Sequence, residues 1–270
     1  MRKLLLLLLL SSTLFATEYE PWFGAPWEFH SRLSYTYSHT ERVQSPAGSF
    51  KYIDNYHEFA GSLMMTVWPD LSVEAELAFL TSDDIDFSYE VFILTARKLW
   101  LDDLCGDWIS LATGVTMAFP PKRILHDFDF PYHGHVNAEL HLTAGKEFRS
   151  CCTMEWNWRL WGLIGYGVAE KGSPWVHGLI TFDQGISECA HFSLFMELLY
   201  GLGGENIIPG VPFRGYASIQ HETIDLGGRY QRELGLLGSL SFLGFINVHA
   251  RNFTEHSFGV QAALTIPFGL

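Results

Sequence analysis

The carboxyl-terminal stretch of this 270-residue chain, SFGVQAALTIPFGL from Ser257 to Leu270, constrains the fold more than any other segment. From Phe258 to Phe268 every second residue is apolar, and the residues between them are mostly small or polar. Successive side chains of a β-strand point to opposite faces, so this period of two predicts a strand with one apolar and one polar face.

The same alternation recurs in eleven earlier segments. They lie at about 29–38, 58–67, 71–79, 89–100, 109–117, 136–143, 156–166, 175–183, 192–201, 215–225 and 234–248. The sequence leaves the inward and outward faces of 89–100, 175–183 and 215–225 open. Tight turns alternate with longer loops, and an even number of such strands is typical of a single-chain outer-membrane barrel. We therefore predict an all-β fold: a transmembrane antiparallel up-and-down β-barrel of about 12 strands over residues 27–270, with both termini periplasmic.

The closing segment also resembles the last strand by which the barrel assembly machinery recognises bacterial outer-membrane β-barrels. That resemblance implies that the segment pairs with the first strand, and that outer-membrane lipid and the assembly machinery are partners. In this chain Phe268 is followed by Gly269 and Leu270, so the terminal aromatic residue is displaced. A soluble β-sandwich is the alternative fold, because alternation alone does not distinguish lipid from a protein core.

The amino terminus is typical of a secretory signal peptide. Arg2 and Lys3 precede seven leucines, and small residues lead to Ala16, after which we predict cleavage. Residues 1–16 are then the signal peptide, and residues 17–26, rich in Pro, Gly and aromatics, a periplasmic lead-in. No later apolar run approaches the roughly 20 residues of a transmembrane helix.

Charge and aromatic placement bear on partners and location. Loss of Arg2 and Lys3 changes the formal net charge from −13 to −15, which argues against nucleic acid as a partner. Tryptophans gather at the predicted periplasmic strand ends and tyrosines towards the other rim, as in an interfacial aromatic belt. These residues are Trp22, Trp27, Trp68, Trp100, Trp108, Trp156 and Trp158, and Tyr37, Tyr89, Tyr166, Tyr200 and Tyr216.

The polar faces of the predicted strands define a lumen. Its predicted lining is His30, Arg32, Glu58, Glu74, Glu76, Glu139, His141, Arg159, Glu197 and Gln261. One interpretation is a porin-like passive channel for small polar or cationic solutes. The other is a structural envelope barrel whose lumen is plugged, with the arginines neutralising the glutamates. The sequence leaves these two functions, and the oligomeric state, open.

Four cysteines, Cys105, Cys151, Cys152 and Cys189, fall in or beside predicted periplasmic turns. Their placement in a barrel resembles the cysteine-bearing outer-membrane proteins of chlamydia-like bacteria. That resemblance implies disulfide links to periplasmic envelope proteins. Free thiols without a role are the alternative, and Cys151 and Cys152 lack the partner spacing of a zinc or iron–sulfur site.

One catalytic pattern competes with the channel. His191, Ser193 and Glu205 are similar in spacing to the His-x-Ser plus acid or amide arrangement of outer-membrane phospholipase A and lipid A 3-O-deacylase. Leu194 stands where those families carry a flanking Asn, so a lipid hydrolase is the least favoured function. His133 and His135 have no carboxylate or Cys nearby in sequence, and we expect no metal site and no cofactor there.

Overall fold

The computed structural model describes residues 19–149 and 156–269, so the predicted signal peptide, Cys151 and Cys152 lie outside the described residues. The strands are β1 (Glu28–Gln44), β2 (Phe50–Trp68), β3 (Leu71–Thr81), β4 (Ser88–Leu101), β5 (Ser110–Phe119), β6 (Asn137–Arg149), β7 (Trp156–Ala169), β8 (Trp175–Ser187), β9 (Ala190–Gly201), β10 (Glu222–Glu233), β11 (Ser239–Arg251), β12 (Phe253–Glu255) and β13 (Phe258–Gly269). Two short 3₁₀ helices, η1 (Ile124–His126) and η2 (Gly235–Leu237), lie in connections. None of the helices among these residues is long and apolar enough to cross a membrane.

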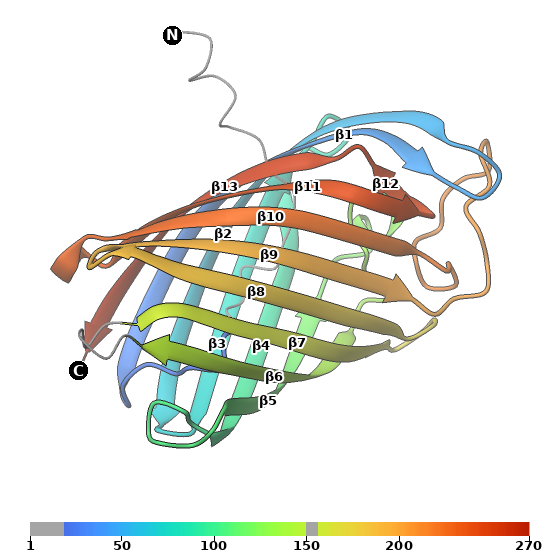
Figure 1. The fold of residues 1–270 in the computed structure, drawn as a ribbon. Coiled ribbons are helices and arrows are strands. Elements are labelled where there is room, and N and C mark those ends of the chain that lie inside the picture. Colours follow the sequence, from blue (N-terminus) through green and yellow to red (C-terminus); the bar gives the residue numbers. More distant parts are fainter. Residues whose placement is uncertain (1–18, 150–155, 270) are drawn as a thin grey trace, which may run out of the picture.

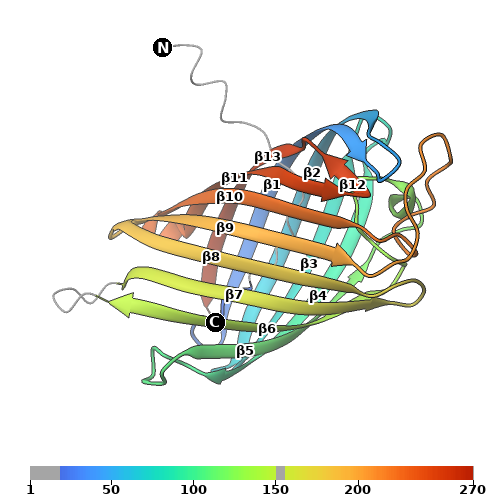
Figure 2. The ribbon, with the colours of Figure 1, turned by 45° about the vertical axis from the view of Figure 1, so that its right-hand side comes forward.

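A single antiparallel sheet closes on itself to form a barrel (Figures 1 and 2). Each long strand pairs with its neighbours in sequence, and β1 pairs with both β2 and β13. The β1–β13 seam runs in register from the Glu28–Gly269 pair to the His39–Phe258 pair. Closure satisfies the backbone groups that an open edge would leave unpaired. The predicted barrel of 12 strands and its closing strand are therefore confirmed, and three-residue β12 only extends the sheet beside β1.

The two ends of the barrel differ in their connections. One end, which we call the short-turn end, carries the connections 69–70, 102–109, 188–189 and 234–238, the start of β1 and the end of β13. The other, the long-loop end, carries 45–49, 82–87, 120–136, 170–174, 202–221 and the β11–β13 connection. This asymmetry agrees with the predicted alternation of tight turns and longer loops.

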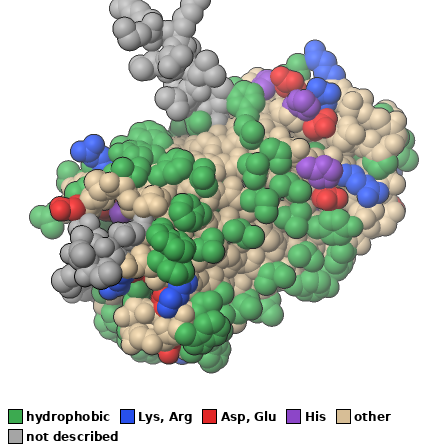
Figure 3. Space-filling model, viewed as in Figure 1, with side chains coloured by type: hydrophobic (Ala, Val, Ile, Leu, Met, Phe, Trp, Pro, Cys, Tyr) green, Lys and Arg blue, Asp and Glu red, His purple; other side chains and the backbone are tan. Residues whose placement is uncertain are grey.

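The outer wall is apolar. Exposed Leu33, Phe59, Leu140, Ile164 and Leu194 come from five different strands. Figure 3 shows hydrophobic side chains spread over the middle of the wall, with charged side chains towards the two ends. A soluble protein would bury such a surface, so the pattern is typical of a lipid-facing wall.

Among the members of the expected aromatic belt whose side chains the structure describes, most lie outside the barrel, but two do not. Trp27, Trp68, Trp100 and Trp108 are exposed near the short-turn end. Trp22 instead packs inside the barrel, and Tyr216 is fully buried in the 202–221 connection. Their predicted rim positions are wrong because both side chains find polar or aromatic partners in the interior.

The structure also assigns the strand faces that the sequence left open. Val91, Ile93, Thr95 and Arg97 of β4 are buried inside the barrel. In β8 the inward set includes His177 and Asp183, and in β10 it includes Thr223. The predicted bounds of the tenth strand are wrong, since 215–221 belongs to the preceding connection, and residues 226–233, which the prediction left between the tenth and eleventh strands, are part of β10.

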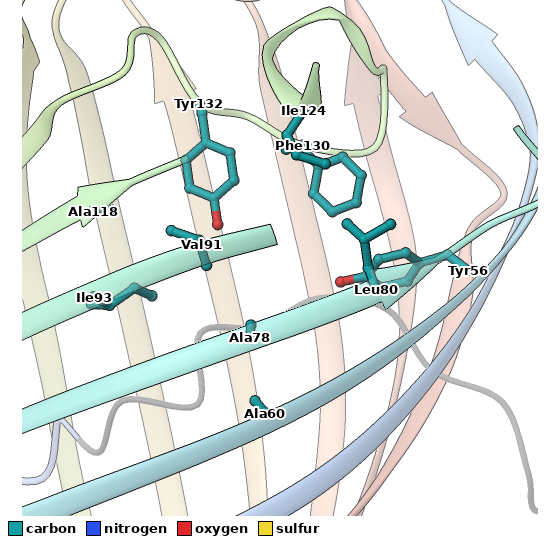
Figure 4. Close-up of a cluster of buried hydrophobic side chains, with 10 residues drawn as sticks. All are labelled: Tyr56, Ala60, Ala78, Leu80, Val91, Ile93, Ala118, Ile124, Phe130 and Tyr132. Atoms are coloured by element: carbon teal, nitrogen blue, oxygen red, sulfur yellow. The ribbon is translucent and has the colours of Figure 1, made fainter. Parts of the chain in front are cut away.

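There is a physical reason why the sequence did not show which face of β4 points inward. Val91 and Ile93 point inward although they are apolar, because the 120–136 connection folds back into the barrel and covers them. Figure 4 shows Ile124, Phe130 and Tyr132 of this connection facing the strand residues Tyr56, Leu80, Val91 and Ile93. The inward face of β4 is therefore apolar at Val91 and Ile93, which weakens the period of two in this part of its sequence.

Candidate functional site: the barrel interior

The amino-terminal segment Tyr19–Phe23 lies within the barrel. Tyr19 is 7% exposed, and its ring meets the rings of His141 and His177 edge-on, with centroids 5.1 and 5.8 Å apart. Trp161 and Leu163 of β7 complete an apolar cluster around Tyr19. Residues that we expected to form a periplasmic lead-in thus fill part of the interior.

Polar contacts hold this segment at the short-turn end. The indole Nε1 of Trp22 donates to Asp103 Oδ1 at 2.8 Å, and the Arg159 guanidinium lies 4.6 Å from the Trp22 ring centre. Arg97 donates from Nη1 to the Glu20 carbonyl at 2.9 Å, and its guanidinium lies 5.1 Å from the Phe23 ring. Arg97 of β4 and Arg159 of β7 therefore bind Tyr19–Phe23 to the barrel wall.

Asp103 anchors this contact from the 102–109 connection. It accepts hydrogen bonds from the Ser110 hydroxyl at 2.6 Å and the Glu147 backbone N–H at 2.7 Å, besides Trp22. Burial opposes the charged form, but these hydrogen bonds outweigh it and hold the pKa of Asp103 below its usual range. The acceptor of the Trp22 indole is therefore an ionised carboxylate at neutral pH.

Gly145 of β6 provides the space for the segment. A Cβ atom at this position would lie 2.7 Å from Trp161 Cβ, 2.8 Å from Pro21 Cγ and 2.9 Å from the Trp22 ring. Any larger residue would have to displace Trp161 or the segment. Glycine at position 145 therefore allows the amino-terminal segment to pack inside the barrel.

An imidazole bridges two carboxylates at the centre of the barrel. His177 is 2% exposed, and its Nδ1 and Nε2 atoms lie 3.0 Å from Glu139 Oε1 and Glu197 Oε1 respectively. The other oxygen of Glu139 accepts the Trp175 indole N–H at 2.9 Å. His177 must donate at both nitrogens to satisfy both carboxylates, which favours its charged form.

The predicted lumen residues fall into distinct groups. Arg32 donates to Gln261 Oε1 at 2.8 Å, and Gln261 donates to the Thr36 hydroxyl. Glu139 and Glu197 are joined through His177, and Arg159 pairs with Glu147, which the sequence analysis did not single out. The remaining members, His30, Glu58, Glu74, Glu76 and His141, belong to β1, β2, β3 and β6, and all but His30 are buried.

Two neighbouring cavities of about 90 and 60 Å³ lie in the interior, and Tyr19 and Glu197 line both. A water molecule needs roughly 10–15 Å³ by a comparable measure, so each cavity has room for several. Carboxylates dominate their walls: Glu20, Asp129, Glu139, Asp183, Glu197 and Asp225 face two arginines, Arg32 and Arg229, and His177. The walls thus hold more acidic than basic side chains.

Aromatic residues pack against one another inside the barrel near the long-loop end. His221 packs against His133, Tyr216 and Phe253, with ring centroids 5.1, 4.8 and 5.9 Å away. Burial lowers the pKa of His133 to about 4 and that of His221 to about 3. Both imidazoles are neutral at physiological pH, so this aromatic cluster carries no charge.

The candidate catalytic residues are not brought together. His191 and Ser193 lie near the start of β9, at the short-turn end. Glu205 lies beyond the other end of β9, where it accepts a hydrogen bond from Ser218. Eight residues of strand from Ser193 to Gly201 span roughly 27 Å, too far for a catalytic hydrogen bond.

The structure places two of the four cysteines. Cys105 and Cys189 are exposed and unpaired, in the 102–109 and 188–189 connections of the short-turn end. Of the two expected loop histidines, His133 donates from Nδ1 to the Ser173 carbonyl at 2.7 Å. His135 is held through its backbone N–H by Glu170.

Comparison with known proteins relates the chain to others by structure only. No protein family model matches it, and no curated protein matches it in sequence. An outer membrane channel from Pseudomonas putida F1 superposes with a TM-score of 0.68 at 11% identity, over 94% of this chain and 100% of that one. The NanC porin superposes with a TM-score of 0.52 at 8% identity, over 87% and 100%. The fold is that of a bacterial outer-membrane β-barrel.

Sequence reasoning missed several interior residues of this outer-membrane barrel. His177, Arg97 and Asp225 lie on the strands whose faces were left open, so no pattern placed them inside. Tyr19–Phe23 showed no alternation at all. A cluster of aromatics just before the first strand was the one indication, since aromatic side chains need a surface to pack on.

Proposed function

We propose that this protein is a passive channel of the bacterial outer membrane for small polar or cationic solutes. The proposal includes export by cleavage of residues 1–16 and insertion with both termini in the periplasm. The two acid-lined cavities carry it, because six carboxylates outnumber the three basic groups along their walls. An excess of fixed negative charge in a narrow, water-filled space raises the local concentration of cations.

The second candidate is a structural barrel with a plugged lumen. Two observations favour it: Tyr19–Phe23 fills the interior at the short-turn end, and Ile124, Phe130 and Tyr132 fill it from the other end. The cavities between them are small. Under this alternative the amino-terminal segment is a permanent plug, whereas under the channel proposal it narrows an open path.

Planar-bilayer recording separates the two functions. We expect the folded wild-type protein to give small conductance steps, and Trp22→Ala to give larger ones because it removes the contacts with Asp103 and Arg159. Trp68→Ala is the matched control, since Trp68 is exposed on the outer wall at the same end. Absence of steps from heat-modifiable wild-type and Trp22→Ala protein would support the plugged barrel instead.

Disulfide linkage to periplasmic envelope proteins is a further part of the proposal. It is supported by the exposure of Cys105 and Cys189 at the end where we place the periplasm. A hydrogen bond with Asp102 and its negative charge raise the pKa of Cys105, so its thiol is less reactive than an ordinary one. A non-reducing gel of isolated envelopes that shows only monomer would exclude the linkage.

A further inference from the structure

Three aspartates meet where the 120–136 connection enters the long-loop end. Asp54 lies on β2, and Asp127 and Asp129 lie on the connection. One carboxylate oxygen of each residue lies within 4.8 Å of the others. In the described part of the chain, no ion pair involves any of the three.

Asp54 gives a separate indication that a ligand belongs here. Its side chain is 1% exposed, and Oδ1 accepts the Asp83 backbone N–H at 2.9 Å. Oδ2 is buried and has no hydrogen-bond partner among the described residues. A buried carboxylate oxygen without a donor costs free energy, which a cation at the same place would recover.

The surrounding side chains hold the aspartates in position. Thr40 donates to Asp129 Oδ1 at 2.8 Å, and the Tyr52 hydroxyl lies 3.2 Å from both Asp127 Oδ1 and Asp129 Oδ2. That hydroxyl has one proton and satisfies only one of them at a time. Phe128, between the two aspartates, packs against Tyr52 with ring centroids 5.2 Å apart, so the connection is fixed against β2.

We propose that Asp54, Asp127 and Asp129 bind one divalent cation, with calcium preferred over magnesium. Calcium takes six to eight oxygen ligands at about 2.3–2.6 Å, so ligands on opposite sides of the ion lie up to about 5 Å apart. The spacing of the three oxygens suits that ion, and solvent or main-chain oxygens complete its shell. The cation fastens the 120–136 connection to the wall beside the larger cavity, which Asp129 also lines. This site does not depend on the channel function.

Terbium luminescence tests the site directly in the folded full-length protein. Terbium occupies calcium sites, and Tyr52 is close enough to sensitise its emission. We expect saturable luminescence that calcium displaces at lower concentration than magnesium. Asp54→Asn keeps the oxygen that accepts the Asp83 N–H but loses the charge, and we expect at least about tenfold weaker terbium binding.

Two further variants keep the test decisive. Asp129→Asn retains an acceptor for Thr40 and removes a second ligand, so it gives the same weakening if Asp54→Asn does not fold. Asp86→Asn removes an exposed charge from the 82–87 connection and leaves binding unchanged. The proposal is overturned if luminescence does not saturate in wild-type protein, or if folded Asp54→Asn and Asp129→Asn bind terbium as tightly as wild-type protein does.

Discussion

At the scale of single residues, His177 is buried between two carboxylates. It is the donor shared by Glu139 and Glu197, and removing it leaves one buried and one partly buried carboxylate without that partner. Breaking a buried ion pair in this way typically costs about 3–5 kcal/mol. We therefore predict that His177→Leu lowers the free energy of unfolding by an amount of this order, measured by urea titration in micelles.

The control for this prediction is His126→Leu, which changes an exposed histidine of η1. It should leave the urea midpoint almost unchanged. Equal midpoints for His177→Leu and the wild type would show that Glu139 and Glu197 do not rely on His177.

The proposed cation site has a pH dependence that follows from its carboxylates. Burial, with the nearby charge of Asp54, raises the pKa of Asp127 from its usual 3.8 to about 6, and burial with the charge of Asp127 raises that of Asp129 further. The other ionisable groups near this pair are Tyr52 and Asp54 of β2, Asp84 of the 82–87 connection and Tyr216 of the 202–221 connection. Every one of them is acidic, so none offsets the repulsion.

The sign of the effect differs with and without the cation. Without it, a raised pKa means that the protonated form stabilises the fold at low pH and that this stabilisation is lost as the pH rises through about 6. A cation requires the ionised form, so protons compete with it. We predict that the calcium affinity measured by calorimetry falls at least about tenfold from about pH 8 to about pH 5. An affinity independent of pH would contradict the assignment of Asp127 as a ligand.

The residues that sequence patterns predict well are those on clearly alternating strands. Glu139 and Glu197 were expected inside and are found bridged there. His177 was missed because β8 carries apolar or small residues on both faces, such as Val176 and Leu179, so its polar face was not visible. Periodicity reports which face a residue occupies only when the two faces differ in polarity.

At the scale of elements, the amino-terminal segment is the clearest departure from expectation. Its contacts with Asp103, Arg97 and Arg159 join residues far apart in the sequence, which no local pattern encodes. The predicted bounds of the tenth strand were wrong because a local pattern again failed to show a long-range contact. Gly227 and Gly228 suggest a turn, but Gly227 faces inward, where a Cβ atom would lie 2.2 Å from the Phe195 ring.

Gly145 allows the seating of the segment to be tested. We predict that Gly145→Leu expels Tyr19–Phe23 from the interior, because even a Cβ atom would collide with Pro21 and Trp22. Chymotrypsin, which cleaves after aromatic residues, should then remove the amino terminus several times faster, as followed by mass spectrometry. Gly178→Leu is the control, since a Cβ atom there meets nothing closer than 3.7 Å. Equal cleavage rates in both variants would mean that the segment is not held by this packing.

At the scale of the whole molecule, closure was predictable and the filling of the interior was not. An even number of alternating segments, with connections of two kinds, leads to a closed barrel once unpaired strand edges are excluded. No comparable rule predicts the apolar inner surface that Phe130 and Tyr132 cover. That surface exists because the 120–136 connection folds back into the barrel. The barrel therefore follows from the sequence, while the shape of its lumen follows from long-range packing.

The proposed channel function requires a path across the barrel that is lined by acidic side chains. The reversal potential of the wild-type protein in a planar bilayer under a KCl gradient tests it most directly. We predict a shift towards the equilibrium potential of potassium, because carboxylates outnumber basic groups along both cavities. A shift towards the equilibrium potential of chloride, or no current at all from folded protein, would contradict it.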